Sequence, residues 1–221
     1  MPPVTCHMSP ERSHPLLGVV SLGAGASSRM GRPKLLLPWG DTSVIGHLIG
    51  QWRALAARQI AIVCRPGDEA LGATLDQLGF PRADRLENPQ PERGMFSSIR
   101  CAANWTGWKR EITAWAIVLG DQPHLRLETL RTVLKFQAAH PGSVCQPEFG
   151  GHARHPVLLP RPAFRELKQT PAETLNAFLK QTSCRVAKCP IEDPGLSLDL
   201  DTPEDYQRAR GSTNVAGKAV R

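Results

Sequence analysis

The sequence lacks the apolar runs that membrane spans and secretory signals need. A membrane span takes about 18 consecutive apolar residues, whereas the apolar runs here are short segments such as residues 16–22 and 115–119. A secretory signal has roughly 7–15 apolar residues after a basic start, but prolines, histidines and charged residues interrupt residues 1–15. We therefore expect a cytoplasmic protein that has no membrane partner.

Cysteines are few and scattered. The six cysteines include no Cys-x-x-Cys pair, and only Cys184 and Cys189 lie close together in the sequence. Zinc sites and disulfide frameworks both depend on recurrent cysteine spacings. The sequence therefore predicts reduced cysteines packed as small apolar side chains, and neither a zinc site nor a disulfide framework.

Aromatic residues are also scarce, at 5% of the chain, and Tyr206 is the only tyrosine. Lysine and arginine (27 residues) exceed aspartate and glutamate (20 residues), which gives a formal net charge of +7. This excess suits anionic partners, but the sequence shows neither a basic helix nor the interleaved aromatic residues that bind nucleic acid. We therefore expect small anionic ligands and no nucleic acid.

What is present suffices for one folded domain. The 221 residues are 41% hydrophobic, and a chain of this length buries a sizeable core within the usual size of a single domain. We expect residues 16–210 to form this domain. Residues 1–15 and 211–221 are expected to be a flexible extension and a flexible tail.

Short apolar runs alternate with helical patterns along the chain. The expected strands are residues 16–22, 60–64, 82–87, 114–119, 143–148, 157–159, 185–191 and 196–200. The expected helices are residues 44–56, 69–78, 96–105, 127–140, 173–179 and 203–210. Thr42 or Ser43 is a candidate N-cap for the first helix, and Thr202 is the candidate for the last. Fully apolar strands that alternate with helices predict an α/β fold, in which helices flank both faces of a mainly parallel sheet.

A glycine-rich segment, GAGASSRMGRPK over residues 23–34, follows the first expected strand. Glycines let the backbone approach a ligand and direct N–H groups at an anion, while Arg29 and Lys34 add positive charge. The segment lacks the Gly-Lys-Ser/Thr of a Walker A loop, and Ser28 stands where a dinucleotide-binding fingerprint has its third glycine. It is either a phosphate-binding loop of another kind or an ordinary tight turn with solvated basic residues.

An acidic residue follows a second buried strand. Asp121 comes just after residues 114–119, and ligands of open α/β sheets bind at the carboxyl ends of the strands. A carboxylate beside a triphosphate is a natural ligand for Mg²⁺, which prefers oxygen ligands. The alternative roles for Asp121 are a turn residue or a helix cap.

Six segments occur in the same order as in the molybdenum cofactor cytidylyltransferases, which belong with the related guanylyltransferases to the MobA-like nucleotidyltransferases. They are residues 22–34, Leu37-Pro38-Trp39, Asn88-Pro89 with Gly94-Met95 and Ser97-Ser98-Ile99, Gly120-Asp121-Gln122-Pro123, His155-Pro156-Val157-Leu158, and residues 199–205. The resemblance covers residues 16–210. It implies a single-domain, three-layer, Rossmann-like nucleotidyltransferase fold. It also implies a Mg²⁺-dependent enzyme that transfers CMP from CTP to the terminal phosphate of molybdopterin cofactor and releases pyrophosphate.

Carried over position by position, the resemblance also implies roles for individual residues. The implied catalytic residues are Arg29, Lys34 and Asp121. The implied nucleotide contacts are Gly23, Ala24, Gly25, Ser28, Arg29, Gly31, Lys34, Asn88 and Ser97. The implied contacts to the second substrate are Gln122, Arg154 and His155, and the implied metal ligands are Asp121 with Asp201 or Asp199.

Some of these residues have an equally plain structural role. Asn88, Ser97 and Ser98 either contact a ligand or cap the helix that follows them. His155 either donates to a substrate or forms a structural hydrogen bond. Trp39 either stacks on a ligand or covers the core, and we favour the core.

The family pattern favours a cytidine nucleotide. Relatives that use guanine nucleotides tend to have glycine in place of Ala24 and to lack the Leu-Pro-Trp segment at residues 37–39. This chain departs from the pattern at Gly23, where alanine is commoner, and at Arg154, where glycine is commoner. An arginine there places a cation near a phosphorylated acceptor.

Two other functions stay open at this point. One is a related enzyme that uses GTP or a sugar or polyol phosphate. The other is a non-catalytic protein that hands the cofactor to a molybdoenzyme or its maturation factor.

Overall fold

The computed structural model describes residues 15–25 and 30–216. The main strands are β1 (Leu17–Leu22), β4 (Gln59–Cys64), β5 (Arg85–Glu87), β6 (Ala114–Leu119), β7 (Val144–Phe149), β8 (His152–Ala153), β9 (Val157–Pro160) and β10 (Val186–Pro190). The α-helices are α1 (Val44–Ala54), α2 (Glu69–Gln77), α3 (Met95–Asn104), α4 (Leu127–Ala139), α5 (Arg161–Glu166), α6 (Leu175–Gln181) and α7 (Pro203–Ala216). None of the described helices is long and apolar enough to span a membrane.

The main strands form one eight-stranded sheet in the order β10-β7-β9-β6-β1-β4-β5, with β8 paired to β7. Strand β1 runs parallel to both of its neighbours, β4 and β6. Strand β4 is also parallel to β5, and β7 is parallel to β10. Strand β9 runs antiparallel to β6 and β7. The sheet is therefore mostly parallel, as expected.

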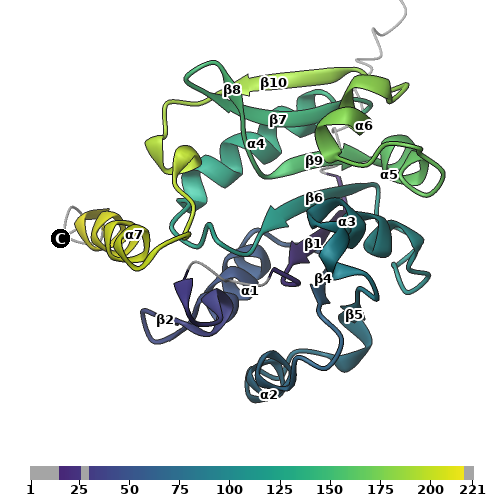
Figure 1. The fold of residues 1–221 in the computed structure, drawn as a ribbon. Helices are drawn as coiled ribbons and strands as arrows, with labels where there is room; N and C mark the ends of the chain where they lie inside the picture. Colours follow the sequence, from purple (N-terminus) through teal and green to yellow (C-terminus); the bar gives the residue numbers. More distant parts are fainter. Residues whose placement is uncertain (1–14, 26–29, 217–221) are drawn as a thin grey trace, which may run out of the picture.

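Helices cover both faces of this sheet (Figure 1). Buried side chains of α1, α2, α4 and α7 form one apolar cluster, and those of α3, α5 and α6 form a second cluster on the opposite face. Neighbouring residues of β1 point to opposite faces, so that Val19 packs in the first cluster and Val20 in the second. This arrangement is the predicted three-layer α/β/α fold, and it explains why the strands are apolar on both faces.

The order of the strands fixes where a ligand can bind. Strand β1 pairs with β4 on one side and with β6 on the other. The chain continues from β1 through α1 to β4 and from β6 through α4 to β7, so these two connections run to opposite sides of the sheet. Open α/β sheets bind their ligands in the crevice at such a point. The segments that follow β1, β4 and β6 therefore mark the expected site.

The helix starts follow their predicted caps. The Ser43 side chain accepts a hydrogen bond from Gly46 N at 3.2 Å and caps α1. At α7, Asp205 N donates to Thr202 Oγ1 at 3.2 Å, while Thr202 N donates to Asp205 Oδ2 at 3.0 Å. This reciprocal pair is a capping box. Helix α7 reaches Ala216, so it includes part of the expected tail and extends beyond the expected end at residue 210.

Two expected strands are wrong in whole or in part. Residues 196–200 alternate apolar and polar side chains, but Pro194–Ser197 is a 3-10 helix that the Asp193 side chain caps. Leu196 and Leu200 are nevertheless buried, because this segment packs across the sheet rather than pairing with it. In the other case, only Arg85–Glu87 forms a strand, and Arg82–Asp84 is a 3-10 turn.

The sequence patterns also missed short elements. A small antiparallel hairpin joins β2 (Pro38–Trp39) to β3 (Thr42–Ser43). Trp39 in this hairpin is buried against His47 and Tyr206, which confirms the favoured core role. Helix α5 and strand β8 were not expected either.

Candidate functional site

A cavity of about 470 Å³ opens at the carboxyl ends of β1, β4 and β6. Its lining comes from the glycine-rich segment, the ends of these strands, and the start of α3. The lining residues are Leu22, Gly23, Ala24, Gly25, Lys34, Leu35, Arg65, Pro91, Glu92, Gly94, Met95, Ser98, Leu119, Gly120 and Asp121. Segments that are far apart in the sequence thus meet at the expected position.

Lys34 lies between two carboxylates in this cavity. Its Nζ donates to Asp201 Oδ1 at 2.6 Å and lies 3.5 Å from Asp121 Oδ2. The lysine begins a short 3-10 helix, Lys34–Leu36, just after Pro33, and its side chain is 15% exposed. The predicted catalytic lysine and both predicted metal ligands, Asp121 and Asp201, therefore form one cluster.

Asp121 is largely buried, where a negative charge is costly. Burial raises the pKa of its carboxyl above the ordinary value and the negative charge of Asp199 raises it further, while Lys34 acts in the opposite direction. Asp121 Oδ1 is buried and has no hydrogen-bond partner among the described residues. A buried carboxylate oxygen without a donor is well suited to a cation.

The segment before α7 brings Asp199 and Asp201 to this place. Leu200 N donates to the backbone oxygen of Asp121 at 3.0 Å. Gln122 Nε2 donates to Asp199 Oδ1 at 2.8 Å, and His124 Nε2 donates to Gly195 O at 2.9 Å. The turn after β6 therefore holds the returning segment at three points.

The glycine-rich segment forms another wall of the cavity. Gly23 N donates to Val63 O at 2.8 Å, which ties the end of β1 to the end of β4. A side chain at Gly23 would meet Val63 O and Leu35 Cδ1 at 3.1 Å. This contact gives a physical reason why this chain, with Leu35 beneath the loop, has glycine where alanine is commoner.

Three of the predicted loop residues are not among the described residues that line the cavity. Ser28 and Arg29 fall outside the described residues. Gly31, at φ +70°, is exposed and does not line the described part of the cavity. The loop contacts that these residues were expected to make remain predictions.

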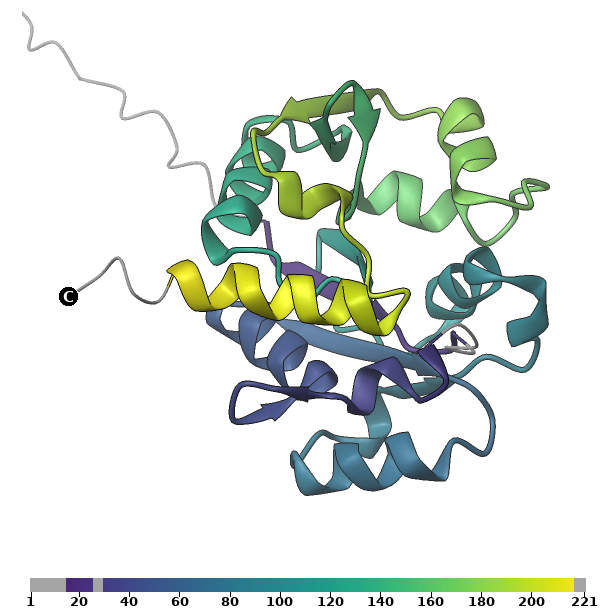
Figure 2. The same cartoon turned by 60° about the vertical axis from the view of Figure 1, so that its left-hand side comes forward.

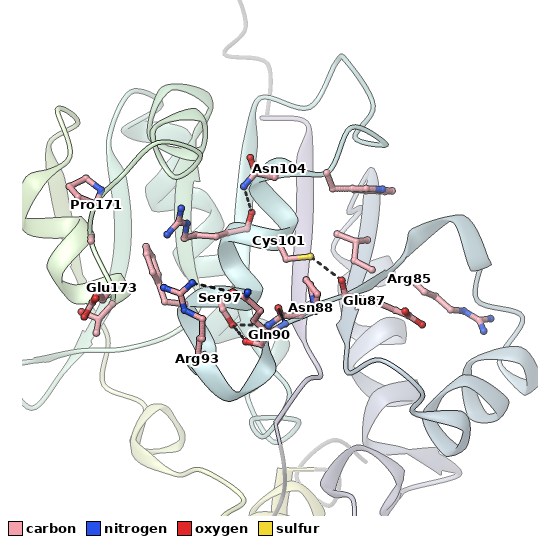
Figure 3. Close-up of a pocket in the computed structure, with 17 residues that line it drawn as sticks. Arg85, Glu87, Asn88, Gln90, Arg93, Ser97, Cys101, Asn104, Pro171 and Glu173 are labelled. Atoms are coloured by element: carbon pink, nitrogen blue, oxygen red, sulfur yellow. Dashed lines mark hydrogen bonds between the residues drawn. The ribbon is translucent and has the colours of Figure 1, made fainter.

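Asn88 and Ser97 hold the loop that leads into α3. Asn88 is buried, and its Nδ2 donates to Ser97 Oγ at 2.7 Å and to Ser98 Oγ at 3.0 Å, while its Oδ1 accepts from Gln90 N at 3.0 Å. Figure 3 shows Asn88, Gln90 and Ser97 in the lining of a second, larger cavity of about 950 Å³. Neither side chain caps α3, whose N-cap is Gly94 and which has no side-chain cap hydrogen bond. Both residues order the loop before the helix instead, and direct contact with a nucleotide remains a prediction.

The predicted contacts to the second substrate, Gln122, Arg154 and His155, have different surroundings. Gln122 is buried next to Asp121 and engages Asp199. His155 Nδ1 donates to Ile117 O at 3.3 Å, and burial lowers the pKa of its imidazole. Arg154 Nε is buried without a partner in the described part of the chain. None of Gln122, Arg154 and His155 is among the described residues that line the 470 Å³ cavity.

Several residues that line the cavity were not predicted as contacts, and Arg65, Glu92 and Met95 are among them. Arg65 directly follows β4, Glu92 lies in a 3-10 turn (Pro91–Arg93), and Met95 begins α3 with 42% of its surface exposed. The rule that pointed to Asp121, a polar residue just after a buried strand, applies equally to Arg65. Glu92 and Met95 carry no such signal.

The acidic residues suit a metal ion that takes few protein ligands. Within residues 15–25 and 30–216, no group of three or more His, Cys, Asp or Glu side chains could hold a metal ion. Mg²⁺ usually keeps several waters and binds one or two carboxylates together with substrate phosphates. Asp121, with its unpartnered buried oxygen, and Asp201 beside it therefore fit such an ion.

Several known proteins resemble this chain in sequence or in fold. The chain is 26% identical over 189 residues to the molybdenum cofactor cytidylyltransferase of Escherichia coli, a match that covers 85% of this chain and 92% of that protein. A molybdopterin-guanine dinucleotide biosynthesis protein A from Archaeoglobus fulgidus has the same fold, with a TM-score of 0.65 at 18% identity over 91% of this chain and 99% of that chain. Rv0371c of Mycobacterium tuberculosis, solved as a complex with manganese, superposes with a TM-score of 0.61 at 25% identity over 89% of this chain and 99% of that one.

A family model matches residues 19–187, which include most of β1, the glycine-rich segment and the turn after β6. The chain belongs to the family described as the MobA-like NTP transferase domain.

Proposed function

We propose that this nucleotidyltransferase transfers CMP from CTP to the terminal phosphate of molybdopterin cofactor and releases pyrophosphate. The observation that carries the proposal is the cluster of Lys34, Asp121 and Asp201 beside the glycine-rich segment. This cluster lies where the order of the strands reverses, between β1 and β6. The similarity to a cytidylyltransferase over most of the chain supports it. Ala24 and the Leu-Pro-Trp segment at residues 37–39 support cytidine as the nucleoside.

Both proposed reactants are anionic, so catalysis depends mainly on positioning and on neutralising charge. A phosphate oxygen of the acceptor attacks the α-phosphorus of CTP, and the bond to the β-phosphate breaks. Lys34, with Arg29 and the backbone N–H groups of the loop, neutralises the departing pyrophosphate. No nucleophile from the protein is needed.

Asp121 and Asp201 are the residues that would hold Mg²⁺. A bound magnesium ion supplies positive charge to the phosphates and helps to align them. Because Lys34 contacts both carboxylates, its positive charge offsets part of their negative charge. We assign Gln122, Arg154 and His155 to the side of the acceptor.

The test is incubation of the protein with molybdopterin cofactor, Mg²⁺ and each of the four nucleoside triphosphates in turn. Pyrophosphate release and the dinucleotide product are both measured. We expect product with CTP and molybdopterin. Product only with GTP would replace the nucleotide assignment, and tight nucleotide binding without turnover would favour a carrier that delivers cofactor to a molybdoenzyme or its maturation factor.

A further inference from the structure

Two of the charged side chains that line the 470 Å³ cavity have no partner among the described residues. The charged residues of its described lining are Lys34, Asp121, Arg65 and Glu92. Lys34 and Asp121 contact each other, but the side chains of Arg65 and Glu92 form no hydrogen bond or ion pair with any described residue. The described lining therefore has one pair of charged residues in contact, Lys34 and Asp121, and two charged side chains, Arg65 and Glu92, that a ligand can bind.

Backbone hydrogen bonds fix the position of Arg65. Gly23 N donates to Val63 O at 2.8 Å, and Asn88 N donates to Cys64 O at 2.9 Å. The last two residues of β4 thus bind the glycine-rich segment on one side and the loop before α3 on the other. Arg65, the next residue, leaves the sheet between these two loops.

The order of the strands places Arg65 and the proposed metal ligand Asp121 on opposite sides of β1. Asp121 follows β6, which lies on one side of β1, whereas Arg65 follows β4 on the other side. Glu92 lies in the turn before α3, and the apolar side chains of Pro91 and Met95 line the cavity beside it. This end of the cavity combines an apolar surface with one cation and one carboxylate, which suits a flat heterocycle with a polar edge.

We infer that Arg65 and Glu92 together read the edge of the nucleobase and select cytosine over uracil. This inference rests on the proposed function and explains its choice of nucleotide. A guanidinium only donates hydrogen bonds, and an ionised carboxylate only accepts them. Cytosine offers acceptors at O2 and N3 to Arg65 and an amino group at N4 to Glu92.

Uracil fits this pair poorly. It has an oxygen at C4 in place of the amino group, so a carboxylate facing that position meets a second acceptor. Replacing Glu92 by glutamine removes the charge and adds an amide NH₂ that can donate to this oxygen. The substitution therefore reverses the chemistry at one contact with almost no change of shape.

The experiment measures the affinities of the full-length protein for CTP and UTP by calorimetry in the presence of Mg²⁺. For Glu92→Gln we expect the preference for CTP over UTP to fall by about tenfold or more, the scale of a hydrogen bond to a charged group. For Arg65→Gln we expect weaker binding of both nucleotides, because both carry O2. Glu92 is exposed, so circular dichroism should show an unchanged fold.

Two matched variants serve as controls. Glu87→Gln and Arg93→Gln change the same residue types in the neighbouring 950 Å³ cavity, and we expect both to keep the wild-type ratio of affinities. An unchanged ratio in Glu92→Gln, with wild-type protein that binds CTP, overturns the inference and leaves the proposed function standing. Wild-type protein that binds neither nucleotide, or that prefers GTP, overturns both.

Discussion

Gln122 Nε2 donates a hydrogen bond to Asp199 Oδ1 at 2.8 Å, which joins the turn after β6 to the segment that returns from β10. The backbone bond from Leu200 to Asp121 reinforces this connection. Asp201, one residue further on, can therefore reach Lys34. Gln122, which was expected to contact substrate, therefore helps to position the segment that carries Asp199 and Asp201.

Removing the charge of Lys34 should abolish most activity. We expect Lys34→Met to lower kcat by about a hundredfold or more, because one preorganised group that stabilises transition-state charge is commonly worth that much. Nucleotide-dependent pyrophosphate release is the measurement. Lys135→Met, an exposed change on α4, should keep full activity, and a Lys34→Met protein with wild-type kcat would refute the mechanism.

The pair Gln122 and Asp199 should behave as one unit. We expect Gln122→Ala and Asp199→Asn each to reduce kcat/KM, and the double variant to lose clearly less than the two losses multiplied together. Residues in one hydrogen-bond network commonly couple by about 0.5–3 kcal/mol. Steady-state kinetics of the four proteins measures this coupling, and independent effects would show that Gln122 does not position Asp199.

Asp193 should make stability depend on pH. Burial alone would raise the pKa of its carboxyl, but hydrogen bonds from Thr129, Arg126 and Gly195 N outweigh this and lower it below the ordinary value of 3.8. A lowered folded-state pKa stabilises the protein above pH 3.8, and this stabilisation is lost as the pH falls through the folded-state value.

Replacement of this carboxylate should therefore cost stability only where it is ionised. We expect Asp193→Asn to lower the free energy of unfolding at pH 7, and the difference from wild type to shrink toward pH 3. Urea denaturation at a series of pH values gives the result. A difference that is the same at every pH would indicate that the charge of Asp193 is unimportant.

Gly120 should not tolerate a side chain. A Cβ there would lie 2.8 Å from both Leu22 O and Leu35 Cδ2, and the backbone oxygen can move only with β1. We expect Gly120→Ala to cost about 1–3 kcal/mol, the usual range for overpacking, and to displace Asp121. Thermal unfolding measures the cost. Gly142→Ala, where nothing lies within 4 Å, should leave the melting temperature nearly unchanged.

Long elements were predictable because burial gives them a strong pattern, on both faces of a central strand and along one side of a helix. Strand β6 has its expected bounds, Ala114–Leu119, and β4 and α4 differ from expectation by a single residue at one end. Residues 196–200 show the limit of such patterns. Their alternation reflects packing of Leu196 and Leu200 on the core, and the segment pairs with none of the described strands.

The candidate site was predictable where it follows the ends of buried strands. Lys34 and Asp121 come from segments with clear signals, and the structure places them in contact. The roles of Asn88 and Gln122 in ordering loops were harder to see, because a sequence shows polar groups without their partners. Glu92 lies in an exposed turn, where only the fold reveals that it faces the cavity.

The contact between Lys34 and Asp201 joins residues 167 positions apart. Helix α7 begins at Pro203, two residues after Asp201, and lies beside the hairpin of β2 and β3 (Figure 2). There Tyr206 donates to Pro38 O and its ring lies against Trp39. During synthesis, Lys34 and Asp121 leave the ribosome long before Asp201, since domains emerge from the N-terminus onward. A nascent chain can therefore build the glycine-rich wall and the first carboxylate, but the second carboxylate and the helix that holds it come last. Only a chain completed through α7 has the whole site.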